Sequence, residues 1–451
     1  MNKTERLGKE KINKLLIKLS LPATVGMFAM GLYNVVDAIF IGRGVGVLGI
    51  AGITIIMPIQ MLITAIGITV GIGGASIISR NLGAKNNEKA NITFGNMITI
   101  TIIISFIMLI IGYVFMKPVL LLFGAKGEII QYAKDYLSVI LIGTPFISFA
   151  MMSNNVIRSQ GNAKVAMISM LISALTNIIL DPIFIFSFNM GIKGAATASV
   201  ISQFITFFYI IHFFRKGNGV IKIKMNKKYI KPKKPIVKEI FAIGMSSFVR
   251  QGSGSIMTIV LNHTLIIYGG ELSVAVFGIV IRILRFLFIP MLGIAQGFLP
   301  VSGFNYGAKN YKRVKEVFKK SNIATFIIGL TGFSITMIFA KQIISLFTTD
   351  PVLIKQGIYA LRIIILAIPI VGFNIIGSSY YQASGKALPA LFLSLLRPII
   401  LIIPLVLIIP VLFGLNGIWY SFPIADIISV LIVSVIIIPE LKHLKKLEKE
   451  K

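Results

Sequence analysis

Residues 98–116 read ITITIIISFIMLIIGYVFM, a stretch without a single charged side chain. A helix needs about 20 consecutive apolar residues to cross the hydrocarbon core of a bilayer, so this stretch can span a membrane on its own. Similar runs fill most of the 451-residue chain, which is 56% hydrophobic and 13% charged, with a mean hydropathy of +0.90. A β-barrel would alternate apolar and polar residues, and these runs do not. The sequence therefore predicts an all-α membrane protein.

Charged residues, glycines and prolines divide the chain into twelve predicted transmembrane helices. We expect them near residues 15–42, 48–79, 92–116, 131–158, 163–188, 191–214, 236–267, 271–300, 317–340, 353–381, 387–411 and 416–440.

The distribution of Lys and Arg tests this helix count. With the N-terminus placed inside, 33 of the 45 basic residues fall in segments on the cytoplasmic side, and six fall in the outward loops. Such a bias controls topology in multi-pass proteins, so the net charge of +30 is better explained by orientation than by nucleic-acid binding. We expect an inner-membrane protein with both termini in the cytoplasm, and residues 1–18 lack a cleavage site and are expected to be retained.

The two halves of the sequence repeat each other. GAKN at residues 83–86 recurs at 307–310, and QGNA at 160–163 is echoed by SGKA at 384–387, both displaced by 224 residues. Six helices per half give both repeats the same orientation. We expect an N-lobe at 1–214, a cytoplasmic interlobe loop at 215–235 and a C-lobe at 236–451, arranged around a central cavity.

Three carboxylates lie well inside predicted helices: Asp37, Asp181 and Asp426. At 1.5 Å per residue, Asp37 and Asp181 lie roughly 8 and 10 Å from the outer ends of their helices, and Ser199 lies about 12 Å from its own. Asn177 precedes Asp181 by one helical turn. These oxygens suit Na⁺ or a shared proton rather than a transition metal. The alternative is that both aspartates face water or loop amides.

Other residues inside the spans are harder to interpret. Pro22 kinks its helix, either as a hinge or as a static bend. Arg250, Arg282 and Arg285 lie near mid-membrane and should face the cavity or a partner, because lipid exposure is costly there. Arg362 and Asp426 have similar depths and are expected to neutralise each other.

Several classes of chemistry have no support in the sequence. Cysteine is absent, which excludes disulfides and thiol ligands. The three His residues lack metal-ligand spacing, and the glycines at 71–74 have no P-loop lysine. We expect no catalytic site and no cofactor.

The sequence resembles the MATE (multidrug and toxic compound extrusion) family over essentially its full length, and most of all its MepA-like and DinF-like prokaryotic branches. The stretches that carry the resemblance are YNVVDAIFIG at 33–42, GA at 83–84, RSQG at 158–161, NIILDPIF at 177–184 and GAATAS at 194–199. The family implies two six-helix lobes around a cavity and export of amphipathic, often cationic drugs driven by inward H⁺ or Na⁺.

The resemblance also implies a site. In the archaeal and DinF-like branch, the N-lobe ion site uses residues that correspond to Asp37, Asn177, Asp181 and, with Ser in place of Thr, Ser199. The C-lobe acids of the NorM-like branch have no counterpart, since Arg250 and Arg362 occupy those helices. Coupling is thus assigned to the N-lobe, and substrate contacts to the cavity candidates Tyr33, Arg250, Arg282 and Arg285.

Two functions remain in competition. The first is a cation-coupled multidrug antiporter that works by alternating access. The alternative is a flippase for an anionic lipid-linked saccharide, favoured by the C-lobe arginines. In either case we expect the partners to be the lipid bilayer and small amphipathic molecules, with no nucleic acid, and we expect the chain to function as a monomer.

The charge bias generates a test of topology. A cysteine introduced at Asn226, in the basic segment between the halves, should react with a membrane-impermeant maleimide only after cells are opened. The natural chain offers no competing thiol. Labelling from outside intact cells would contradict the predicted orientation.

Overall fold

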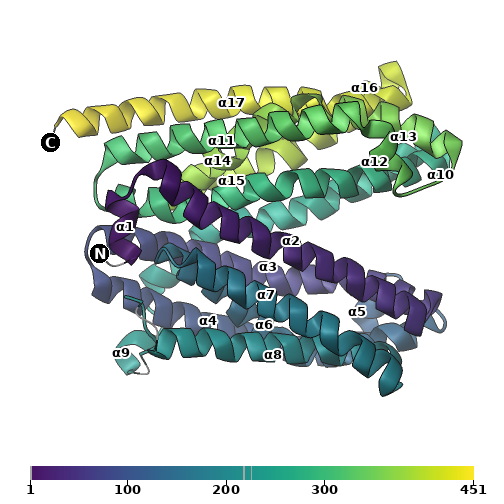
Figure 1. Ribbon diagram of the computed structural model, residues 1–451, viewed down its shortest axis with the longest axis horizontal. Helices are drawn as coiled ribbons and strands as arrows, with labels where there is room; N and C mark the ends of the chain where they lie inside the picture. The colour runs from purple at the N-terminus through teal and green to yellow at the C-terminus, as the bar shows by residue number, and fades with distance from the viewer. Residues whose placement is uncertain (1–2, 217–218, 225, 451) are drawn as a thin grey trace. The chain divides into compact units, whose positions relative to one another are not determined.

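The computed structural model describes residues 3–216, 219–224 and 226–450, and these ranges contain helices but no strand (Figure 1). The helices of the first half are α1 (Lys3–Lys9), α2 (Ile12–Gly44), α3 (Val47–Gly83), α4 (Asn87–Val114), α5 (Met116–Leu122), α6 (Ile129–Ser159), α7 (Ala163–Pro182), the π-helix η1 (Ile183–Ser187), α8 (Gly191–Lys216) and α9 (Lys227–Ile230). Those of the second half are α10 (Lys234–Gly307), α11 (Tyr311–Ile338), α12 (Ala340–Ser345), α13 (Pro351–Ile364), the 3₁₀-helix η2 (Ile365–Ala367), α14 (Ile368–Ser384), α15 (Ala387–Leu395), the π-helix η3 (Leu396–Ile402), α16 (Ile403–Phe413) and α17 (Leu415–Lys449).

The predicted count of twelve spans is confirmed. In the described ranges, eleven continuous helical segments are long and apolar enough to cross a membrane. One of them is α10, whose 74 residues are two helices in succession, because Gly270 interrupts it with φ 64° and ψ −168°. A residue with a Cβ rarely adopts such a conformation, so the glycine marks the turn between the seventh and eighth spans.

The internal repeat is visible in the backbone. Lys85 and Lys309 both have positive φ, 60° and 55°, and the next residues, Asn86 and Asn310, both cap the following helix by accepting a backbone hydrogen bond. Glycines with positive φ recur at the same displacement or one residue less: Gly46 with Gly270, Gly161 with Gly385, and Gly191 with Gly414. The two halves are therefore structural repeats as well as sequence repeats.

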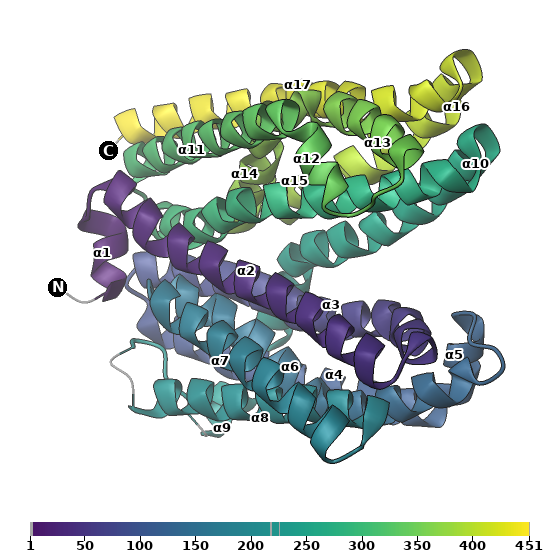
Figure 2. The ribbon, with the colours of Figure 1, turned by 45° about the vertical axis from the view of Figure 1, so that its right-hand side comes forward.

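The chain forms two compact units. The first comprises Val25–Gly244 with the described residues up to Arg6, and the second comprises Leu7–Thr24 with the described residues from Met245 onward. The boundaries fall inside α1, α2 and α10. In the second unit, α17 packs against α11, α13, α14 and α16 (Figure 2).

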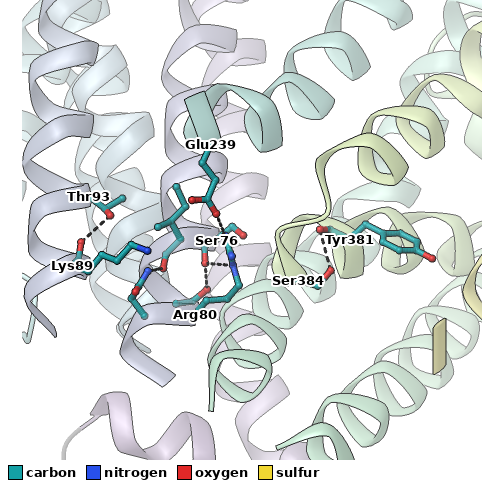
Figure 3. Close-up of polar contacts among 10 residues, drawn as sticks. Ser76, Arg80, Lys89, Thr93, Glu239, Tyr381 and Ser384 are labelled. Atoms are coloured by element: carbon teal, nitrogen blue, oxygen red, sulfur yellow. Dashed lines mark hydrogen bonds and ion pairs between the residues drawn. The ribbon is translucent and has the colours of Figure 1, made fainter. Parts of the chain in front are cut away.

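Small residues bring the start of α10 onto α3 in the first unit. A side chain at Gly73 would collide with the carbonyl of Ile240, and one at Gly244 would collide with the carbonyl of Thr69. Close backbone approach of this kind is typical of helix packing in membranes. At the end of α3, Arg80 lies between the Ser76 carbonyl, at 3.3 Å, and the Glu239 carboxylate, at 2.7 Å (Figure 3).

Hydrogen bonds hold the basic segment between the halves against α4. The Asn91 side chain accepts from the amide of Lys222 at 3.0 Å, and the Asn96 side chain accepts from the amide of Lys233 at 2.6 Å and donates to the carbonyl of Lys231 at 3.3 Å. The described parts of this predicted loop are thus fixed to the first unit. Residues 217, 218 and 225, which belong to the same predicted loop, lie outside the described residues.

The expected pairing of Arg362 with Asp426 is wrong. Arg397, on η3, forms a two-pronged ion pair with Asp426 on α17, with Nη2 and Oδ2 3.2 Å apart. Its guanidinium also lies over the ring of Phe288, 5.8 Å from the centroid. Arg362 is exposed and donates to the carbonyl of Met337. Two side chains at a similar depth in the membrane do not necessarily meet. The rotation of each helix about its own axis decides which side chains face each other.

The Arg397–Asp426 pair generates a prediction of stability. Asp426 is only 2% exposed, so Arg397→Gln should leave an uncompensated buried charge and lower the free energy of unfolding by about 3–5 kcal/mol. The double variant Arg397→Gln/Asp426→Asn should recover most of this loss, because no isolated charge remains. Thermal unfolding in detergent measures both, and equal loss in the single and double variants would contradict the pairing.

Candidate functional site

The polar residues singled out in the N-lobe come from three helices of the first unit. Asp37 lies on α2, Asn177 and Asp181 lie on α7, and Ser199 lies on α8. The Asn177 amide donates to Asp181 Oδ1 and to Ser199 Oγ, both at 3.2 Å. The structure thus brings together Asn177, Asp181 and Ser199, as their spacing and depth predicted.

The local backbone explains how α8 comes so close to α7. After Asp181 and Pro182 the chain continues as the π-helix η1, and the backbone amide of Phe188, the residue after it, donates to the carbonyl of Ile183. Gly194 on α8 faces this turn, and a Cβ there would collide with the carbonyl of Phe184. The small residues at the start of α8 therefore permit the contact that places Ser199 beside Asn177. π-Helical turns occur frequently at functional sites.

Asp37, on α2, adds a second carboxyl group to the site. Its carboxyl group is close enough to that of Asp181 for the two to interact directly. Both residues are buried, at 9% and 0% exposure. Two adjacent carboxylates out of contact with water repel each other, and a proton or a cation between them removes that repulsion.

Three oxygens of this group accept no hydrogen bond from any described residue. They are Asp37 Oδ1, Asn177 Oδ1 and Asp181 Oδ2, all buried. A buried polar atom without a partner costs free energy, and buried oxygens without partners are uncommon in folded proteins. A set of carboxylate, amide and hydroxyl oxygens matches the ligands preferred by hard cations. These four residues could therefore hold Na⁺ or a shared proton.

Two tyrosines lie within electrostatic range of the acids. Tyr33 is one helical turn before Asp37 on α2, and Tyr136 reaches the group from α6. Gln60, on α3, donates to the Tyr136 hydroxyl at 3.4 Å. Tyr33 was predicted to line the substrate cavity, and it lies beside the acid pair. Tyr136 and Gln60 were missed, because a single uncharged polar residue in an apolar span carries no distinctive sequence signal.

The C-lobe arginines form no comparable group. Arg250 is half-buried on the first helix of α10, and Arg282 and Arg285 are exposed on the second. None of the three forms an ion pair with an acid in the described ranges. Their assignment to the substrate cavity stays a prediction.

Pro22 lies in α2, which remains helical on both sides of it. The boundary between the two compact units crosses α2 between Thr24 and Val25, two residues after this proline. Pro22 thus belongs to one unit and Asp37 to the other. The hinge role stays a prediction.

A model of the MatE family matches residues 22–183 and 242–408 of this chain. The multidrug export protein MepA of Staphylococcus aureus (strain NCTC 8325 / PS 47) is 29% identical over 429 residues, which are 95% of this chain and 94% of that protein.

Solved structures agree with this match over the whole fold. A crystal structure of MATE in complex with MaL6 has a TM-score of 0.93 and 29% identity, and the match covers 99% of this chain and 100% of that one. A transporter of the MOP superfamily from Pyrococcus furiosus Vc1 (DSM3638) has a TM-score of 0.92 and 29% identity, with 98% of both chains covered. The reverse polarity of the binding pocket in that transporter is described as suggesting a different function.

Proposed function

Because this chain belongs to the MatE family of membrane transporters, we propose that it exports amphipathic, often cationic compounds across the inner membrane in exchange for inward-moving H⁺ or Na⁺. The similarity to the multidrug export protein MepA supports the class of substrate. The single observation that supports cation coupling is the group of Asp37, Asn177, Asp181 and Ser199, with three buried oxygens that lack hydrogen-bond donors.

In the proposed mechanism the cation acts on the shape of α2. When H⁺ or Na⁺ binds between Asp37 and Asp181, the repulsion and the desolvation cost fall, and α2 bends toward α7 and α8. Loss of the cation straightens α2. Pro22 is the hinge, since its ring and missing amide donor weaken the helix at the unit boundary.

In this scheme the drug and the cation need not bind to the same protein atoms. They exclude each other because each prefers a different form of α2, and this difference in affinity is the coupling free energy. Tyr33 and the arginines Arg250, Arg282 and Arg285 contact the drug. The chain functions as a monomer, with both termini in the cytoplasm.

The second candidate is a flippase for an anionic lipid-linked saccharide. Its specific support is the set of arginines Arg250, Arg282 and Arg285, which form no ion pair with any acid that the structure describes and suit an anionic headgroup. The related transporter with a pocket of reverse polarity gives a precedent for divergence of function within this fold.

The proposal is tested by transport of an amphipathic cationic dye into inverted vesicles. A pH gradient and a Na⁺ gradient, imposed separately, should identify the coupling ion, since only the coupled gradient drives dye accumulation. Dye movement under neither gradient, together with translocation of an anionic lipid-linked saccharide, would favour the flippase instead.

Asp37→Asn and Asp181→Asn should each reduce gradient-driven dye transport to the level of vesicles without the protein. Asn resembles the protonated acid in shape but cannot release a proton or bind a cation tightly. The control is Asp135→Asn in the same unit, where the carboxylate pairs with Lys193 at 3.3 Å. This control should transport normally, and full transport by either site variant would contradict the mechanism.

Substitution of Arg250, Arg282 and Arg285 by Gln, one at a time, should change the order in which a panel of compounds is exported. The dependence on the ion gradient should stay the same, because the proposed coupling site consists of first-unit residues and these arginines belong to the second unit. Dose–response growth assays with the panel measure the first effect, and dye transport in vesicles measures the second. The reverse pattern would contradict the assignment of these residues to substrate choice.

A further inference from the structure

A cavity of about 660 Å³ lies in the second unit, between the first turns of α13 and α17. Its lining includes Val352, Lys355 and Tyr359 from α13, and Leu415, Asn416 and Trp419 from α17. All of them belong to one compact unit, and none belongs to the coupling site described above. The volume is in the range of about 300–1,000 Å³ that is typical of ligand pockets.

The cavity lies at the ends of membrane-spanning segments. Both Pro351–Ser384 and Leu415–Lys449 are apolar enough to cross a bilayer, and the cavity is formed by the first residues of each. The end of α16, just before α17, exposes Val411 and Leu412 to 70% and 77%. Such exposure of large apolar side chains in a spanning helix indicates contact with acyl chains. The cavity is thus expected at the depth of the lipid headgroups.

The lining is amphipathic. Lys355 is its one ionisable cation, and Asn416 and the Tyr359 hydroxyl add polar groups, whereas Leu415 and Trp419 are apolar. The Tyr359 hydroxyl lies 3.1 Å from that of Tyr420. Tyr and Trp are enriched where a membrane protein meets the headgroups, because each combines an apolar ring with a polar group.

Lys355 has no competing anionic partner. It forms no ion pair with an acid in the described ranges. The neighbouring acid, Asp350, caps α13, and its Oδ1 accepts from the amides of Val352 and Leu353 at 2.8 and 3.3 Å. A cationic ligand would be repelled by the exposed ammonium group of Lys355, whereas an anionic ligand would be attracted to it.

We propose that this cavity binds the headgroup of an anionic phospholipid from the leaflet at this end of the spans. Lys355 pairs with the phosphate, Tyr359 and Asn416 donate hydrogen bonds to its ester region, and Leu415 contacts the start of an acyl chain above the buried ring of Trp419. None of these residues belongs to the coupling site or to the proposed substrate contacts, so the proposal does not depend on which molecule is exported.

The chain contains one tryptophan, Trp419, which lines this cavity, so all tryptophan fluorescence of the protein comes from this position. The full chain is reconstituted in phosphatidylcholine vesicles that contain equal fractions of either dibrominated phosphatidylglycerol or dibrominated phosphatidylcholine. Bromine quenches tryptophan fluorescence at short range. Brominated phosphatidylglycerol should quench Trp419 more strongly than the zwitterionic lipid at the same fraction.

Lys355→Gln should lower this preference for the anionic lipid roughly fivefold, the effect expected of one basic side chain at a membrane surface, and Lys355→Arg should retain it. The matched control is Lys341→Gln, because Lys341 is exposed at the start of α12, at the same end of the spans, and does not line the cavity. This control should leave quenching unchanged. Equal quenching by the two lipids, or equal effects of Lys355→Gln and Lys341→Gln, would overturn the proposal.

Discussion

Each backbone amide and carbonyl that enters the hydrocarbon core must find its hydrogen-bond partner within the protein, since lipid offers none. The long helices of this chain satisfy that requirement one residue at a time, and the described ranges accordingly contain no strand. The same lack of hydrogen-bond partners in lipid applies to the polar side chains inside the spans. A carboxylate, amide or hydroxyl at this depth must pair with another protein group or hold an ion, and the two units meet this requirement differently.

The second unit pairs its buried acid internally. Asp426 is held by Arg397, and one turn further along α17 the Asn374 amide donates to Ser429 at 2.7 Å. These contacts join η3, α14 and α17 through groups that satisfy one another. The first unit places Asp37 and Asp181 side by side, and among the described residues the pair has no basic partner and three oxygens of the group have no donor. The two repeats share their turns and caps but differ in the charge balance of their interiors, which supports the assignment of ion coupling to the first unit.

Close helix packing is what makes the first-unit group geometrically feasible. Gly194 lets α8 approach the backbone of η1, and the π-helical turn follows directly after Asp181 and Pro182. A glycine permits the same close backbone approach where Gly73 on α3 contacts the start of α10. Because lipid is as apolar as the side chains that face it, helix association in a membrane depends on such close contacts and on hydrogen bonds between helices.

The sequence alone determined the twelve spans, the repeat, the shared face of Asn177 and Asp181 on one helix and the similar depth of Ser199 on the next, because run length, residue spacing and rise per residue act along one helix at a time. Pairing across helices also depends on how each helix is rotated about its axis, which depth does not specify. For that reason Arg397 rather than Arg362 holds Asp426, and Tyr136 joins the acid pair without a sequence signal. The attachment of the interlobe segment to Asn91 and Asn96 was likewise decided only by the tertiary structure. Its hydrogen bonds connect residues more than 130 positions apart, and positions so far apart in the sequence give no indication that the residues are in contact.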